Sequence, residues 1–342
     1  MTTAAEESKK VPPEPLALLR GHRAPVNAVT FLYNSNDVLC SGDTDGDVYV
    51  WSLPAKRVSH SLMETHPGGV LNLSSSESRY WLSQGRIDGC VKIWDETELI
   101  DVVRTNSESF CRASVIWGEV DNYTLASTNQ DEGVISVWES RNKAARTLLS
   151  PSQEQRWGMV MDVKLVRTPS HLYTISVYED GYLRTFDVTE QKIVPELCLQ
   201  VQPDLSPSTA LILSLPDSSE ISKGIVGGAS NQLASFTLDF SMHQSHFGSF
   251  FPAYHQSQTL DENASHQKYG HGVSQLALRN DNKIFAVASW DYRVRILHFR
   301  TCKHLAVLKH HRDSVHCVAF SNTDGYLASG SKDQNIAIWK IY

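Results

Sequence analysis

The stretch "CSGDTDGDVYVWSL" at residues 40–53 has a close counterpart near the other end of the chain, "ASGSKDQNIAIWKI" at residues 328–341. In both stretches an Asp follows the first Ser by four residues, and a Trp follows that Asp by six. Upstream, "GHRAPVNAVTF" (21–31) matches "HHRDSVHCVAF" (310–320) in the same register. Matching segments at opposite ends of one chain indicate an internal repeat.

Five weaker copies of the pattern lie between these two. Each alternates apolar and polar residues with a period of two, as strands do, and turns through pairs such as Asp45-Gly46 and Asp88-Gly89. The Trp position is filled by Trp51, Trp94, Trp138, Phe186, Phe236, Leu297 and Trp339. Seven units at this spacing resemble the WD-repeat family. The fold predicted is all-β, a seven-bladed β-propeller.

The WD-repeat resemblance also implies a buried hydrogen-bond chain of His, Ser or Thr, Asp and Trp within a blade. Buried polar groups are tolerated where each finds a partner. Blades one and seven keep the full set, and blade two keeps three members. The predicted members are His22, Ser41, Asp45 and Trp51 in blade one, His66, Asp88 and Trp94 in blade two, and His311, Ser329, Asp333 and Trp339 in blade seven.

The strand of the last copy runs into the C-terminus, which would leave its edge bare. In WD propellers the first segment of the chain supplies the missing outer strand. We therefore expect "PLALLRGH" (15–22) to pair, through residues 16–19, on the blade that carries Trp339. The resulting domain plan is a flexible tail at 1–13 and one propeller at 14–342. The longest repeat interval predicts an inserted loop at about 241–267.

Composition excludes several function classes. The 342 residues are 41% hydrophobic and 20% charged, with a net charge of −7, which disfavours general binding to nucleic acid phosphates. Six scattered cysteines form no C-x-x-C pair, so we expect no zinc site, disulfide framework or cofactor. No secretory signal and no run of about 18 apolar residues is visible, so no membrane association is expected. No catalytic motif is present, which predicts a non-catalytic protein.

Two further stretches, "SQGRIDG" (83–89) and "RVRILHFRTCKHLAVL" (293–308), resemble one group in particular, the G protein β-subunit-like protein 1 / ASTRA-associated protein 1 family. The resemblance implies an adaptor that works in the maturation and stability of phosphatidylinositol 3-kinase-related kinases. Its implied partners are the TTT co-chaperone, those kinases and the chromatin-associated ASTRA complex. It also implies a location in nucleus and cytoplasm, and a monomer within a larger complex.

Two alternatives remain open at this point. "SVWESR" (136–141) resembles the box by which some WD proteins bind a cullin-ligase adaptor, with Trp138, Glu139 and Arg141 as its members. A G-protein-β-like signalling scaffold would need a long N-terminal helix for its γ partner. The segment before residue 16 is short and is broken by three prolines, which disfavours that helix.

Partner-binding residues are expected in the turns of one rim and in the predicted insertion. Exposed Arg and aromatic side chains are the usual anchors of such surfaces. The candidates are Arg23, Arg86, Arg312, Asp313 and Lys332 in rim turns, Phe250, Phe251 and Tyr254 in the insertion, and Arg141 in the adaptor box.

Overall fold

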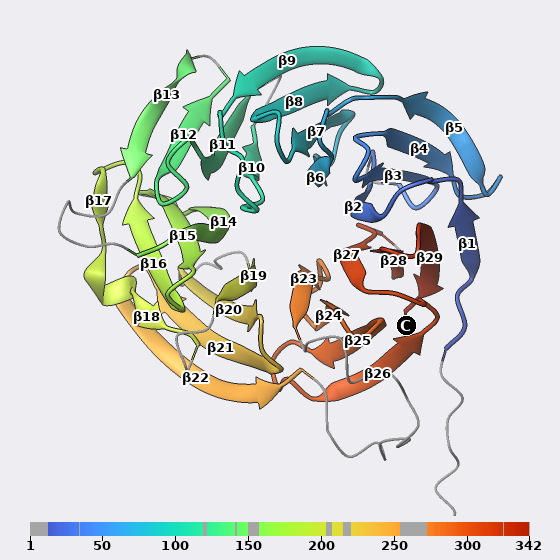
Figure 1. The fold of residues 1–342 in the computed structure, drawn as a ribbon. Helices are drawn as coiled ribbons and strands as arrows, with labels where there is room; N and C mark the ends of the chain where they lie inside the picture. The colour runs from blue at the N-terminus through green and yellow to red at the C-terminus, as the bar shows by residue number, and fades with distance from the viewer. Residues whose placement is uncertain are drawn as a thin grey trace, which may run out of the picture.

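Seven antiparallel sheets form a closed ring of blades, as Figure 1 shows. The computed structural model describes residues 13–341, except 34, 119–121, 141, 150–156, 203–206, 215–219, 254–271 and 324. The predicted all-β, seven-bladed propeller is confirmed. Among the described residues the helical structure is one short 3₁₀ turn, η1 (Pro195–Leu197), and no helix there is long and apolar enough to cross a membrane.

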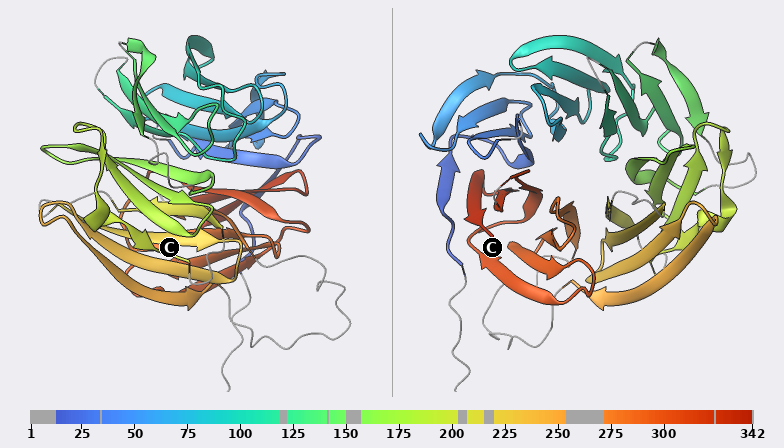
Figure 2. Two further views of the ribbon diagram at one scale, coloured as in Figure 1. Left: turned by 60° about the vertical axis from the view of Figure 1, so that its left-hand side comes forward. Right: turned by 180° about the vertical axis from the view of Figure 1, so that it is seen from behind.

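Within each blade the strands are named from the innermost, beside the central axis, to the outermost. Figure 2 shows the ring from two further directions. Blade one holds β2 (Val26–Phe31), β3 (Val38–Asp43), β4 (Val48–Ser52) and β5 (Arg57–Leu62). Blade two holds β6 (Val70–Ser75), β7 (Tyr80–Gly85), β8 (Cys90–Asp95) and β9 (Glu98–Arg104). Blade three holds β10 (Ser114–Trp117), β11 (Tyr123–Thr128), β12 (Ile135–Glu139) and β13 (Asn142–Leu149).

The remaining blades follow the same plan. Blade four holds β14 (Val160–Arg167), β15 (Leu172–Tyr178), β16 (Tyr182–Asp187), β17 (Lys192–Ile193) and β18 (Leu199–Gln200). Blade five holds β19 (Ser208–Leu213), β20 (Ile221–Gly228), β21 (Gln232–Asp239) and β22 (Gln244–Pro252). Blade six holds β23 (Val273–Leu278), β24 (Ile284–Ser289), β25 (Arg293–His298) and β26 (His304–Lys309). Blade seven holds β27 (Val315–Phe320), β28 (Tyr326–Ser331), β29 (Asn335–Lys340) and β1 (Ala17–Arg20).

The outer strand of blade seven comes from the start of the chain. β1 pairs antiparallel with β29, with Leu19 opposite Ile336, and the Leu16 N–H donates to the Ile338 carbonyl at 2.7 Å. Figure 1 shows the blue β1 beside the red β29. Leu19 is buried in an apolar cluster that joins blades seven and one. This pairing covers the edge that β29 would otherwise expose.

The prediction of a loop at 241–267 is wrong for its first half. β22 pairs antiparallel with β21 and forms the outer, fourth strand of blade five, as in the other blades. Phe250 and Phe251 therefore belong to a strand. Every residue of β22 is exposed or half-buried, so its sequence lacks the apolar–polar alternation by which a strand is recognised. The rest of that prediction, with Tyr254, and most of the predicted tail lie outside the described residues.

A ring of side-chain hydrogen bonds joins each inner strand to the next. Most inner strands carry a β-bulge at their second or third residue, which turns a polar side chain toward the neighbouring blade. The seven links are Asn27–Val70, Asn72–Ala113, Ser114–Leu165, Asp162–Leu211, Thr209–Val273, Gln275–Val318 and His316–Asn27, with distances from 2.5 to 3.2 Å.

Apolar clusters fill the space between blades. Each of the seven clusters combines residues of two neighbouring blades, so every blade covers one face of the next. A single blade therefore has no core of its own, and the ring is stable only when closed.

We expect Leu19→Ala to destabilise the whole propeller, because the substitution leaves a cavity at the closing strand. The expected loss is about 2–5 kcal/mol in the free energy of unfolding, measured by urea denaturation. Leu16→Ala is the matched control, since Leu16 is 54% exposed, and it should change stability by less than about 0.5 kcal/mol. Equal effects of the two substitutions would contradict closure through β1.

Candidate functional site

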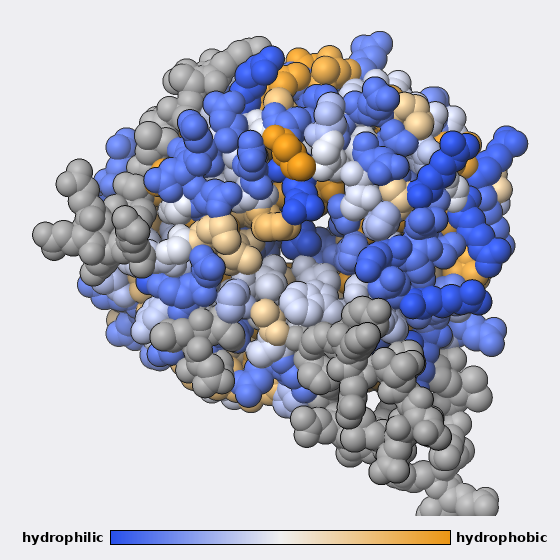
Figure 3. Space-filling view, viewed as in Figure 1, coloured by the Kyte–Doolittle hydropathy of each residue, from blue (hydrophilic) through white to orange (hydrophobic). Residues whose placement is uncertain are grey.

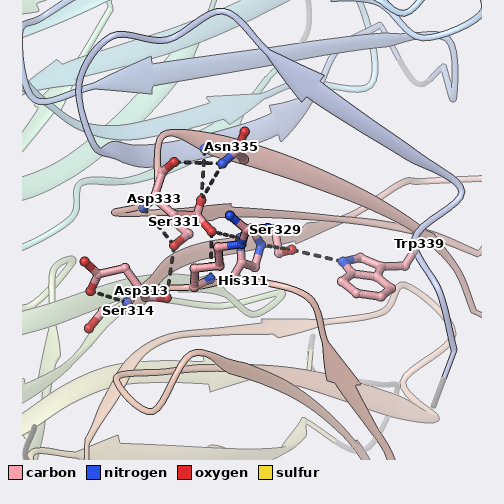
Figure 4. Close-up of polar contacts among 9 residues, drawn as sticks. His311, Asp313, Ser314, Ser329, Ser331, Asp333, Asn335 and Trp339 are labelled. Atoms are coloured by element: carbon pink, nitrogen blue, oxygen red, sulfur yellow. Dashed lines mark hydrogen bonds and ion pairs between the residues drawn. The ribbon is translucent and has the colours of Figure 1, made fainter. Parts of the chain in front are cut away.

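The predicted tetrad of blade seven is present as a buried chain of hydrogen bonds (Figure 4). His311 Nδ1 lies 3.0 Å from Asp333 Oδ2, and His311 Nε2 lies 2.8 Å from Ser329 Oγ. The Trp339 indole N–H donates to the same Ser329 oxygen at 3.0 Å. Indole can only donate and carboxylate can only accept. One arrangement satisfies every atom: Ser329 donates to Nε2, and His311 donates to Asp333 from Nδ1.

Blade two contains the same chain. His66 contacts Asp88 at 2.7 Å and Ser83 at 2.7 Å, and the Trp94 indole N–H donates to Ser83 at 2.8 Å. Ser83 is absent from the predicted set because it precedes Asp88 by five residues, whereas Ser329 precedes Asp333 by four. A comparison of the repeats at a fixed spacing of four residues therefore does not find Ser83.

Blade one corrects a prediction. His22 contacts Ser41 at 2.6 Å and Asp43 at 2.7 Å, and the Trp51 indole N–H donates to Ser41 at 2.7 Å, so Asp45 is not the acceptor. Asp43 ends β3 and is buried, whereas Asp45 is exposed in the turn that follows. The second carboxylate oxygen of Asp43 accepts the backbone N–H groups of Asp45 and Asp47. Asp43 therefore serves His22 and the turn together.

We predict that Asp43→Asn costs about 1–3 kcal/mol of unfolding free energy, because an amide cannot accept with both of its polar atoms. One of the groups that Asp43 now satisfies would meet an N–H₂ donor. Asp45→Asn, the position favoured by spacing, should stay within about 0.5 kcal/mol of the parent. Thermal or denaturant unfolding of the two variants decides between the carboxylates, and a larger effect at Asp45 would refute the assignment.

Asp333 should make folding sensitive to acid. Burial by itself raises the pKa of the Asp333 carboxyl, but hydrogen bonds from His311 and from the Arg312 backbone N–H outweigh it and hold the pKa well below its usual range. A lowered folded pKa stabilises the protein above the unfolded carboxyl pKa of about 3.9, and that contribution is lost as the pH falls below it.

Stability measured from about pH 5 down to about pH 2 should therefore fall more steeply for the parent than for Asp333→Asn. The variant should be the less stable of the two at neutral pH, and the two curves should converge in acid. Parallel curves would show that Asp333 titrates normally in the folded state.

Blades four and six keep the turn Asp but replace its His partner with an Arg. Arg184 forms two hydrogen bonds with Asp180, at 2.9 and 2.7 Å, and Arg295 forms two with Asp291, at 2.9 and 2.5 Å. Both Arg side chains are buried and come from the next strand, four residues after their Asp. A bidentate pair of this kind satisfies both partners without a His.

Aromatic rings surround the first of these guanidinium groups. Arg184 lies 4.3 Å from the centre of the Trp157 ring, 4.9 Å from that of Tyr178 and 5.1 Å from that of Tyr182. Arg is favoured in such stacked positions because its charge is delocalised and weakly hydrated. Ser176 occupies the position that Ser329 has in blade seven, and its buried hydroxyl has no hydrogen-bond partner among the described residues.

The structure offers little support for the adaptor box on blade three. Trp138 is buried in the apolar cluster between blades two and three, where a partner could not reach its ring. Glu139 ends β12, and Arg141 lies outside the described residues.

The buried thiols and one His-carboxylate group are the remaining candidates for chemistry among the described residues. Burial raises the pKa of the Cys40, Cys111 and Cys317 thiols, which disfavours the reactive thiolate. Within the described parts of the chain one group, His171, Asp187 and Glu190, has metal-ligand atoms close together. Within that group His171 Nδ1 lies 2.7 Å from Asp187 Oδ2, and Glu190 pairs with Lys192.

The predicted rim residues do share one face of the ring. In an antiparallel blade, the turn after the second strand and the connection to the next blade lie at the same end. Arg86 and Lys332 lie in turns of the first kind, and Arg23, Arg312 and Asp313 lie in connections of the second kind. We call this face the entry rim.

The entry-rim residues differ in how they are held. Arg23 and Arg312 are exposed, and Arg86 lies 4.5 Å from the ring centre of the exposed Phe110. Lys332 lies 3.8 Å from Asp313. A pocket of about 1080 Å³ on the same rim is lined by the turns around Asn106, 129–133 and 157–159. Its acidic members, Asp131 and Glu132, were not predicted from the sequence.

Comparison with known proteins agrees with this architecture. The family described as "WD domain, G-beta repeat" matches residues 13–52, 57–95, 263–297 and 302–340. These ranges correspond to blades one, two, six and seven, with β1. The family does not match the residues of blades three to five.

Three relatives match nearly the whole chain. It is 33% identical to guanine nucleotide-binding protein subunit beta-like protein 1 of Mus musculus, over 97% of this chain and 97% of that protein. It is 28% identical to ASTRA-associated protein 1 of Aspergillus niger, over 98% of this chain and 87% of that protein. The corresponding protein of Penicillium rubens is 26% identical, over 92% and 82% of the two chains.

Proposed function

Because this chain belongs to the WD-repeat family of guanine nucleotide-binding protein subunit beta-like protein 1, we propose that it is a non-catalytic scaffold that assembles a protein complex. A propeller of this kind is a rigid body with two rims and an outer wall for binding. The tetrads use their His, Ser and Asp side chains as internal links, buried between strands. Their polar groups are satisfied by one another, which favours a structural role over catalysis.

The complex we propose is the ASTRA assembly together with the TTT co-chaperone. Fungal relatives that match at least nine-tenths of this chain carry the name ASTRA-associated protein 1. We propose that this chain has the same kind of association, and that it supports the maturation and stability of phosphatidylinositol 3-kinase-related kinases. A location in both nucleus and cytoplasm follows from that role. The near full-length similarity is the observation that carries the proposal.

The test is a purification of the tagged full-length chain, followed by quantitative mass spectrometry. TTT subunits should be enriched over a tagged unrelated propeller. Acute depletion of the chain should then lower the steady-state amounts of the phosphatidylinositol 3-kinase-related kinases about two-fold or more with unchanged transcripts, because unassembled clients are degraded.

Unrelated kinases are the internal control and should keep their amounts. Recovery of a cullin adaptor instead of TTT subunits, with normal kinase amounts, would favour the substrate-receptor alternative. Recovery of a G-protein γ subunit would favour the signalling scaffold.

A further inference from the structure

Blade two exposes apolar side chains on its outermost strand. Leu99, Ile100 and Val102 of β9 are 48%, 45% and 37% exposed. Figure 3 shows hydrophobic residues, in orange, gathered over β9 at the top of the view. Scattered exposed apolar residues are ordinary, but three within four positions of one strand form a patch.

A pocket adjoins this patch on the rim opposite the entry rim. It has a volume of about 230 Å³ and lies between blades two and three, and Ile100 of β9 is one of its lining residues. Its other lining residues come from the first turn of each blade and from the strands beside it. They include Tyr80, Ile93, Trp117 and Tyr123.

One lining residue of the pocket, Trp117, has a buried polar group without a described partner. The Trp117 indole N–H is buried and finds no acceptor among the described residues. Tyr123, by contrast, donates its hydroxyl to Asp101 at 2.8 Å, so its polar group is satisfied within the protein. A buried donor without an acceptor is costly, and a carbonyl from a bound segment would relieve that cost.

Acidic side chains flank the same surface. Glu77, Glu96 and Glu98 are exposed around the pocket and the start of β9. Arg79 does not offset them, because it already lies 2.9 Å from Asp95. The one cation of β9 itself, Arg104, is at the far end of the strand. The surface therefore favours a cationic partner.

The backbone of β9 completes the arrangement. β9 is the last strand of its sheet, in the order β6-β7-β8-β9, so its outer edge is not paired with another described strand. An extended segment can add to such an edge through main-chain hydrogen bonds, while its side chains enter adjacent pockets. Edge pairing, an apolar pocket and flanking carboxylates then act on one ligand.

We propose that β9 and the Trp117 pocket bind an extended segment of a partner protein in which apolar residues alternate with Lys or Arg. A second copy of this chain is disfavoured as the occupant, because its own net charge of −7 does not complement an acidic surface. The inference rests on the proposed scaffold function and places its docking surface on the rim opposite the predicted one.

The test uses two labelled 12-residue peptides, one of alternating Leu and Lys and one of alternating Leu and Glu, titrated into the full chain by fluorescence polarisation. The Lys peptide should bind, more weakly as salt is raised, and the Glu peptide should bind at least about tenfold more weakly. Hydrogen exchange with the Lys peptide bound should protect the amides of β9. Protection confined to other strands would overturn the proposal.

Substitutions make the test specific. Ile100→Asp should weaken binding of the Lys peptide about tenfold or more, because it removes an apolar side chain that lines the pocket. Trp117→Phe keeps an aromatic side chain but removes the indole N–H donor, and should weaken binding about three- to tenfold. Leu305→Asp is the matched control, since Leu305 is 52% exposed on the outer strand of blade six, and it should have no effect. An equal loss in Leu305→Asp would mean non-specific binding.

Two further readouts separate this inference from the scaffold function. If Ile100→Asp still recovers TTT subunits and the peptide does not bind, the surface is wrong and the scaffold stands. If the peptide binds at β9 but the parent chain recovers no TTT subunits, the surface stands and the proposed partner fails. A dimer by light scattering that Ile100→Asp dissolves would assign the surface to a second copy and overturn the proposal.

Discussion

The seven inner strands are linked to one another by one unbroken ring of side-chain hydrogen bonds, and the placement of every blade depends on it. Each link runs from a polar side chain on one inner strand to a backbone group or side chain of the next blade, and the last, from His316 to Asn27, returns to the first blade. Burial lowers the pKa of His316, which favours the neutral imidazole, and its Nδ1–H donates to the Asn27 oxygen. Strand β1 performs the same closure at the outer edge.

The Asp beside the turn between the second and third strands finds its hydrogen-bond partner in two different ways. Blades one, two and seven bury a His between a Ser and an Asp, with a Trp as the last donor. Blades four and six use an Arg that reaches its Asp from the neighbouring strand. Both arrangements anchor the turn between the second and third strands. The Arg version has no Trp requirement, which allows Phe186 and Leu297 to fill the apolar position.

The two rims of the propeller consequently differ in chemistry. The entry rim contains the turns anchored by the tetrads, with Arg23, Arg86 and Arg312 among them and an acidic pocket on blades three and four. The opposite rim contains the Trp117 pocket and its carboxylates. A scaffold with two chemically different faces can hold two partners at once, which fits a protein that assembles complexes.

Sequence alone determined the blade number, the closing strand and most members of three tetrads, because these features depend on local periodicity and on side chains at nearly fixed spacing. It misassigned Asp45, since Asp43 and Asp45 flank the same turn and only burial distinguishes them. It missed Ser83 because of one extra turn residue, and it missed β22 because an edge strand with no fully buried residue has no clear apolar alternation. The inter-blade ring, the Arg–Asp pairs and the β9 surface join residues from separate strands or blades. Only the tertiary structure brings such residues together, because their distances are set by how the sheets pack rather than by their positions along the chain.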